Sequence, residues 1–192
     1  MPRKKKKIYK NIVLKNVKSY DDLPSNIAIR IERGVGGRRT FRYVNETICT
    51  PTEKGENKPW GYCTIAKPNE EYEGECSGAY IARIIESDNE WGPLLLQVAI
   101  EWASQSNDGL IADRFRVTEF EYHLWNHLLG NQGGDLFTKP VALCLNKSSK
   151  TWSERLGIEE DKIATSFIFF SRNLGSILTY SGERGFRRSI NL

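Results

Sequence analysis

The alternation of apolar and polar positions in residues 79–130 predicts the most regular part of the chain. Tyr80 to Ile85 is a short apolar run rich in β-branched residues, and turn-forming residues follow it at 88–92, so we expect a strand that ends there. Pro93 suits the first turn of a helix, because the N–H that proline lacks has no partner at that position. The segment therefore predicts a strand, a turn and a helix in succession.

The predicted helix carries apolar residues at the spacing i, i+3, i+4 and i+7. These residues are Leu95, Val98, Ala99 and Trp102. The spacing predicts one buried stripe along the helix, which we expect to end at Asn107–Gly109. Leu110–Ala112 then reads as a second buried strand.

A second helix is predicted from its end signals. Thr118 and Glu121 have the spacing of a capping box, in which each side chain accepts a hydrogen bond from the other residue's backbone N–H. Gly130 is the expected end, since glycine is common where a helix stops. Residues 79–130 thus predict strand, turn, helix, strand and helix.

The rest of the chain predicts mainly strands. They are expected at Ile27–Ile31, Thr40–Val44, Trp60–Ala66, Val141–Leu145 and Ser166–Phe170. Ser166–Phe170 is expected to be the last strand of the sheet and to pair with Val141–Leu145. This pattern predicts an α+β fold, in which a mixed, mostly antiparallel sheet is flanked by helices in a single domain over residues 11–170.

Three glycines lie between the first two of these strands, at Gly34, Gly36 and Gly37, and arginines follow at Arg38 and Arg39. A phosphate-binding loop would continue with Lys-Ser or Lys-Thr and a long helix, and neither follows. Glycine is also the usual residue where φ is positive, so we expect a hairpin turn.

Residues 79–130 also resemble a known family. The WGPLL helix, the GLIADR strand and the Trp-containing helix after it are similar to the cofactor-binding half of GNAT-type N-acetyltransferases, and to small acyltransferase-like proteins of tailed bacteriophages. The resemblance implies a GNAT fold and a transferase that passes an acetyl or related acyl group from acetyl-CoA, or another acyl-CoA, to an amine. In that family the turn and helix start receive the pyrophosphate, and a helix N-terminus is in general an anion site because its first N–H groups lack partners.

The resemblance also implies site residues. Its cofactor contacts fall on Ile84, Ile85, Trp91, Gly92, Leu94, Leu95 and Asn126. Glu86, at the end of the strand, is the candidate base that takes a proton from the amine, and Tyr122 is the candidate general acid. Glu86 is alternatively a solvent-facing acid at a strand end.

The net charge of +4 is unevenly distributed. Residues 1–10 hold six basic residues and no acid, so residues 11–192 carry 22 basic and 24 acidic residues, a balance of −2. The basic run predicts a disordered arm that contacts nucleic acid or an acidic partner, or one that only aids solubility. The proposed contacts are Arg3, Lys4, Lys5, Lys6 and Lys7. Residues 171–192 form a second basic extension, with arginines around Phe186.

Other chemistry is weakly signalled. His123 and His127 lie one helical turn apart beside Glu119, but no further ligand has a sequence signal, so we predict no metal. The four cysteines form no C-x-x-C pair and are expected to be free and mostly buried. Asp113 and Arg114 are expected to form a structural pair. The chain has no apolar run near 18 residues, which favours a soluble, cytoplasmic protein, in the host cytoplasm if it comes from a phage.

Acidic residues precede the predicted helix. Asp88 and Glu90 place negative charge where the family holds phosphates, and Pro93 removes one donor. Two alternatives to the transferase therefore stay open. One is a non-catalytic GNAT-fold protein that binds nucleic acid or a host protein, and the other is a GNAT-fold enzyme that modifies nucleic acid.

Overall fold

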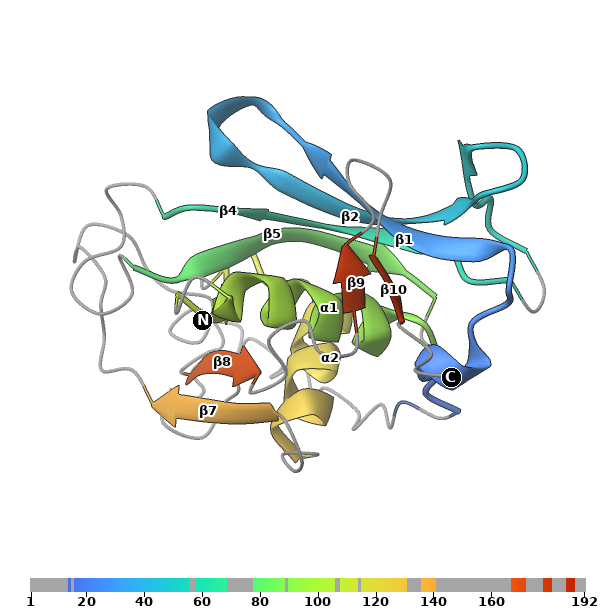
Figure 1. Cartoon of the computed structure of the whole chain (residues 1–192). Helices are drawn as coiled ribbons and strands as arrows, with labels where there is room; N and C mark the ends of the chain where they lie inside the picture. Colours follow the sequence, from blue (N-terminus) through green and yellow to red (C-terminus); the bar gives the residue numbers. More distant parts are fainter. Residues whose placement is uncertain are drawn as a thin grey trace, which may run out of the picture.

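The structure, a computed structural model, describes residues 14, 16–55, 58–68, 78–88, 90–105, 108–113, 115–130, 136–140, 167–171, 178–180 and 186–188. These residues form an α+β fold with a mixed, mostly antiparallel sheet and two α-helices, as the sequence predicts (Figure 1). The helices are α1 (Gly92–Ser104) and α2 (Glu119–Gly130). There are two short 3-10 turns: η1 (Tyr20–Asp22) precedes the first strand, and η2 (Val35–Gly37) lies between the first and second strands.

The described strands belong to one sheet. They are β1 (Ile27–Arg33), β2 (Arg39–Asn45), β3 (Thr50–Pro51), β4 (Gly61–Ala66), β5 (Tyr80–Ser87), β6 (Leu110–Ala112), β7 (Leu136–Pro140), β8 (Phe167–Ser171), β9 (Leu178–Tyr180) and β10 (Phe186–Arg188). Their order is β7-β8-β6-β5-β4-β2-β1-β10-β9, and β3 pairs with β2. Only β5 and β6 are parallel among these neighbours, because α1 carries the chain back between them.

The predicted hairpin is confirmed. β1 and β2 pair from Ile27↔Asn45 to Arg33↔Arg39. Gly36 lies at the turn with φ of 67°, a left-handed conformation that other residues adopt only with strain. The glycines therefore serve a turn between two long strands.

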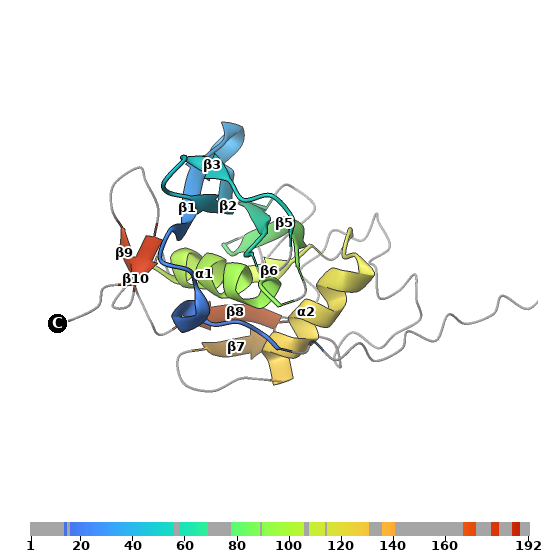
Figure 2. The ribbon, with the colours of Figure 1, turned by 90° about the vertical axis from the view of Figure 1, so that its right-hand side faces the viewer.

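The predicted single buried stripe on α1 is wrong. Its buried residues are Gly92, Pro93, Leu94, Leu95, Leu96, Val98, Ala99, Ile100, Glu101, Ala103 and Ser104, whereas Trp102 is half-buried. Figure 2 shows the reason: α1 lies between β1 and β2 on one side and β8 and α2 on the other. A helix enclosed in this way is buried on nearly all its sides, so the spacing of the largest apolar residues does not define its contacts.

The predicted capping box is confirmed. The backbone N–H of Thr118 donates to Oε2 of Glu121 at 2.7 Å, and the N–H of Glu121 donates to Oγ1 of Thr118 at 3.2 Å. The helix that follows ends at Gly130, as expected. Local sequence therefore determined both ends of α2.

The C-terminal strands differ in part from expectation. Ser166–Phe170 is confirmed as a strand, shifted by one residue in β8, but it is not the last one, since β9 and β10 follow. β8 pairs antiparallel with β6 on one side and on the other with β7, which ends at Pro140. The predicted strand at 141–145 lies outside the described residues. β10 pairs with β1 at Ile29↔Phe186. The 171–192 extension thus contributes strands to the edge of the sheet.

Aromatic residues mark the core. Trp91 and Trp125 are buried. Trp102 meets Phe41 and Tyr80 edge to face, with ring centroids 6.0 and 5.2 Å apart. Among the described residues, no helix combines the length and apolar character that a bilayer crossing requires.

Of the four cysteines, the structure describes two. Cys63 is free and buried, and Cys49 is free but exposed, whereas Cys76 and Cys144 lie outside the described residues. Burial raises the pKa of the Cys63 thiol well above its usual value. Cys63 therefore behaves as a small apolar core residue.

Candidate functional site

The parallel strands β5 and β6 part where the resemblance places the cofactor. They pair at Tyr80↔Leu110 and continue to Ala82↔Ala112, where β6 ends. β5 runs on to Ser87 and keeps only β4 as its neighbour. Two strands that diverge in this way leave backbone groups of β5 without a partner strand.

Side chains occupy the place where the strands part. Arg83 donates from Nη1 to Oδ2 of Asp113 at 2.9 Å, an ion pair that links the ends of β5 and β6. The backbone N–H of Ile85 donates to Oε1 of buried Glu121 at 3.1 Å. Arg114 lies outside the described residues, so the predicted Asp113–Arg114 pair stays a prediction.

The Glu121 carboxyl has an unusual environment. Burial raises its pKa, while the hydrogen bonds from Thr118 and Ile85 lower it and the charge of Asp113 raises it. The carboxyl accepts a backbone N–H on each of its two oxygens. It thus holds α2 against β5 and satisfies a backbone donor that a ligand lying between the strands would otherwise use.

Backbone contacts also close the start of α1. The N–H groups of Trp91 and Gly92 both donate to the carbonyl oxygen of Asp88, at 3.1 and 2.9 Å, and Pro93 has no N–H. The backbone N–H of Lys18 donates to the carbonyl of Glu90 at 2.9 Å, so the segment before β1 lies against this turn. The donors of residues 91 and 92 are therefore satisfied within the chain.

Packing closes the same end of the helix. A Cβ on Gly92 would lie 2.5 Å from Oγ of Ser87 and 3.2 Å from the ring of Phe120, so β5 and α2 approach the helix start directly. Burial raises the pKa of the Asp88 carboxyl, and the charge of Glu90 adds to this effect against that of Lys54. A turn flanked by acids, in which the N–H groups of residues 91 and 92 are already used, does not fit the pyrophosphate of an acyl-CoA.

The predicted cofactor residues differ in their exposure. The buried ones are Ile85, Trp91, Gly92, Leu94 and Leu95. Ile84 points to the opposite face of the sheet from Ile85 and is 45% exposed. Asn126 is half-buried on α2. The structure does not bring these side chains to one open surface.

The two candidate catalytic residues belong to different elements. Glu86 is exposed on β5, opposite Tyr62 of β4. Burial raises the pKa of Tyr62, and a hydrogen bond to Glu86 raises it further. Tyr122 is half-buried on α2, with its ring edge to face with His123.

The two histidines share α2. His123 is buried, and its Nε2 has no hydrogen-bond partner among the described residues. Burial lowers the pKa of half-buried His127. No group of three or more His, Cys, Asp or Glu side chains suited to a metal occurs in the part of the chain that the structure describes.

The β1–β2 hairpin has a positive net charge, and the sequence analysis gave it no functional role. Residues 27–45 contain five arginines and one acid, a balance of +4. The turn is exposed from Arg33 to Arg38, and Val35 at its tip is 93% exposed. Figure 1 shows the hairpin extending beyond the rest of the sheet. The available signal in the sequence was the five arginines of residues 27–45, which lie on either side of a glycine turn.

Arg39 gives the tip a fixed shape. Its Nη1 donates to the carbonyl oxygens of Gly37 and Arg38 at 3.2 and 2.8 Å. Its guanidinium lies 5.6 Å from the ring centroid of Trp102. This arginine therefore braces the turn against the body of the protein.

Comparison of the chain with models of protein families, with curated proteins and with solved structures gives no match. The function must therefore be argued from the geometry of the chain itself. The arm residues Arg3 and Lys4–Lys7 lie outside the described residues.

Proposed function

We propose that the protein is a non-catalytic nucleic-acid-binding protein, in which the β1–β2 hairpin contacts the phosphate backbone. The observation that carries this proposal is the β1–β2 hairpin, where residues 27–45 have a balance of four positive charges and the tip, residues 33–38, is exposed. Nucleic acids present closely spaced phosphates, and arginine binds them through several parallel N–H donors. The basic arm at residues 3–7 adds to the same attraction.

Two arginines at the tip are available for phosphate. Arg33 and Arg38 are exposed, and neither forms an ion pair with any described residue. Val35 lies between them as an exposed apolar residue, suited to contact a sugar or a base. Because Arg39 holds the turn, less conformational freedom is lost when the tip binds.

The outer face of the sheet extends this surface. Arg30, Arg42, Tyr62 and Glu86 lie opposite one another on β1, β2, β4 and β5. The guanidinium of Arg42 lies 5.4 Å from the ring centroid of Tyr62 and 3.5 Å from the carboxylate of Glu32. An arginine beside an aromatic ring supports stacking with unpaired bases, so single strands are the preferred ligand.

Fluorescence anisotropy with a labelled single-stranded oligonucleotide tests the proposal. The double variant Arg33→Glu/Arg38→Glu lowers the net charge from +4 to 0. At low salt, we expect the native protein to bind the oligonucleotide more tightly than the variant does. The slope of the logarithm of the binding constant against the logarithm of the salt concentration should be smaller in magnitude by about one to two units in the variant. The matched control is Lys18→Glu/Arg116→Glu, which changes the net charge equally but lies outside the hairpin.

The control separates a site from general charge. Equal losses of affinity in the two double variants would show that net charge, and not the hairpin, governs binding. No binding at about 50 mM salt would remove nucleic acid as the ligand and leave an acidic protein surface as the partner of the hairpin.

Acyl transfer from an acyl-CoA to an amine, the activity that the GNAT resemblance implies, is our second proposal. It is supported by the path of the chain, in which α1 joins two parallel strands that part after Ala82 and Ala112. Glu86 would then take a proton from the amine. The closed start of α1 argues against it, because the donors of residues 91 and 92 are already used.

Thermal unfolding with millimolar acetyl-CoA tests the second proposal. A ligand present at about 100 times its dissociation constant stabilises the folded state by about 2.7 kcal/mol and raises the melting temperature visibly. An unchanged melting temperature would count against acyl-CoA binding. The result is independent of the hairpin variants, so the two proposals can fail separately.

A further inference from the structure

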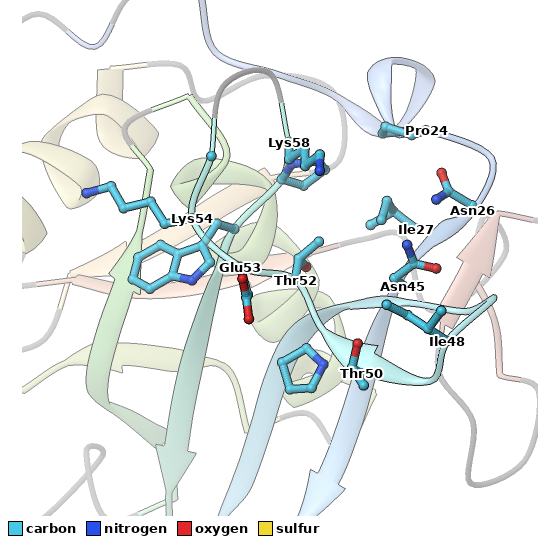
Figure 3. Close-up of a pocket in the computed structure, with 14 residues that line it drawn as sticks. Pro24, Asn26, Ile27, Asn45, Ile48, Thr50, Thr52, Glu53, Lys54 and Lys58 are labelled. Carbon is cyan, nitrogen blue, oxygen red and sulfur yellow. The ribbon is translucent and has the colours of Figure 1, made fainter.

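A pocket of about 910 Å³ lies at the far end of the β1–β2 hairpin from its tip. It is bounded by the start of β1, the end of β2, the loop that contains β3, and the residues that lead into β4 (Figure 3). Ile27↔Asn45 is the strand pair nearest the pocket and Arg33↔Arg39 the pair nearest the tip. Six residue steps along a strand place the two regions about 20 Å apart.

One side of the pocket is rich in hydrogen-bond donors. Figure 3 shows Asn26, Thr52 and Lys58 around the same space. The side-chain oxygen of Asn45 already accepts the backbone N–H of Thr47 at 2.9 Å, which leaves its NH₂ as a donor. These groups suit a ligand that presents acceptor oxygens.

Thr52 supplies the sharpest observation. Its Oγ1 is buried and has no hydrogen-bond partner among the described residues, although the residue lines the pocket. A buried hydroxyl without a partner is unfavourable. Rotation of the side chain about χ1 would turn this hydroxyl from its buried position toward the pocket, where a ligand oxygen would satisfy it. Its backbone is held in place, since the N–H of Thr52 donates to the carbonyl of Tyr43 at 3.1 Å.

The remaining walls are apolar and partly flat. They comprise Pro24, Ile27, Ile48, Pro51, Pro59 and Trp60. Ile48 is 64% exposed at the rim. Lys54 extends away from the pocket and lies 5.7 Å from the ring centroid of Trp60. A flat apolar ring fits such walls. Glu53 is the only acid among the described lining residues, so little negative charge opposes a phosphate.

We propose that this pocket binds a nucleoside monophosphate, either free or as the 5′-phosphorylated end of a strand. The base lies against the apolar walls beside Trp60, and the phosphate accepts hydrogen bonds from Lys58 and Thr52. The volume is within the range of small-molecule sites. The site is separate from the hairpin tip, so it stands whether or not the tip binds nucleic acid.

Isothermal titration calorimetry with adenosine monophosphate tests the site in the full-length protein. Lys58→Ala and Thr52→Val each raise the dissociation constant by about fivefold or more, since each removes one donor to the phosphate. Lys18→Ala and Thr47→Val are the matched controls, because neither residue lines the pocket. These controls leave the dissociation constant unchanged.

Three further ligands identify what is recognised. Adenosine without phosphate and inorganic phosphate alone both bind more weakly than the monophosphate if base and phosphate are held together. A 5′-phosphorylated oligonucleotide that competes with the monophosphate assigns the site to strand ends, and one that does not assigns it to free nucleotides. Arg33→Glu/Arg38→Glu leaves monophosphate binding intact.

Two results would overturn the proposal. The first is the absence of binding at about 5 mM monophosphate, beyond the range of a specific site. The second is equal binding by Lys58→Ala and the native protein. Because Lys58 is exposed, its substitution leaves the fold intact even if Thr52→Val does not fold.

Discussion

The start of α1 and the tip of the β1–β2 hairpin both follow strands and both contain glycine. The start of α1 is closed, because other parts of the chain occupy it, whereas the hairpin tip is open to solvent. At the start of α1, the N–H groups of Trp91 and Gly92 bind the Asp88 carbonyl. At the hairpin tip, Arg33 and Arg38 are exposed and without ion pairs to described residues. A helix start binds an anion only when its N–H donors are free and face solvent. The N–H groups of residues 91 and 92 do not meet this condition, whereas the guanidinium donors of Arg33 and Arg38 face solvent.

The largest effect is expected from Gly61→Ala in the closed region. Gly61 has φ of 142°, and a Cβ there would lie 2.6 Å from the carbonyl oxygen of Glu86. The strained backbone and the clash with β5 should lower the free energy of unfolding by about 3 kcal/mol or more. Urea denaturation monitored by tryptophan fluorescence measures the change, and a loss below about 1 kcal/mol would mean that the end of β5 is loosely held.

Glu121→Gln should have the second-largest effect. The amide keeps one acceptor oxygen but places an NH₂ group against the N–H of Ile85 or Thr118, so we expect a loss of about 1 to 3 kcal/mol of stability. The same urea titration measures it. Exposed Glu119→Gln on the same helix is the matched control and should leave stability nearly unchanged.

The pH dependence of Glu121 sharpens this prediction. Its folded-state pKa is raised, so the folded state holds the proton more tightly than the unfolded state does. Its contribution to stability is therefore fully present below the ordinary pKa of glutamate and is lost as the pH rises through the raised value. The charge of Asp113 raises the pKa of Glu121, and the charge of Glu121 raises the pKa of the Cys63 thiol. In Glu121→Gln, the free energy of unfolding measured from pH 4 upward should lack the part of its fall with pH that comes from Glu121. A pH dependence equal to that of the native protein would assign this fall to another group.

Gly36→Ala should have a smaller effect, in the open region. A Cβ at Gly36 would meet no atom within 4 Å, so the cost comes from the left-handed backbone alone. We expect a loss of about 1 to 2 kcal/mol. The native hairpin should persist, with unchanged far-ultraviolet circular dichroism. A loss as large as that of Gly61→Ala would contradict the open character of the tip.

Arg33→Glu/Arg38→Glu should affect stability least. Both side chains are exposed and lie outside the core, so the free energy of unfolding should change by less than about 0.5 kcal/mol. Nucleic-acid affinity should fall in the same variant, as proposed above. A large loss of stability would show that these arginines serve the fold, and the hairpin would then not be a binding surface.

Strong local signals predicted much of the fold. The alternation in Ile27–Ile31, the glycine turn after it and the Thr118–Glu121 capping box each specify a local structure that depends on few distant contacts. The predicted α+β class with a mixed, mostly antiparallel sheet followed from these signals. The boundaries agreed to within a few residues for the strands β1, β2, β4, β5, β6 and β8.

Long-range contacts decided what the sequence analysis missed. The burial of α1 on nearly all sides depends on elements before and after it in the chain, so the spacing of Leu95 and Trp102 did not reveal it. β10 pairs with β1 across more than 150 residues of chain, at Ile29↔Phe186. Such a pairing has no local signature, since a three-residue strand at a chain end resembles a loop.

The sequence by itself determined the strand, turn, helix, strand and helix of residues 79–130, because periodicity, proline and the capping box act over a few residues. Only the tertiary structure decided that this unit does not present its helix start to solvent. That outcome depends on where Asp88, Glu121 and Phe120 meet it in space. The same folding left the tip of the arginine hairpin exposed, because a hairpin that projects beyond the neighbouring strands has nothing to cover its tip.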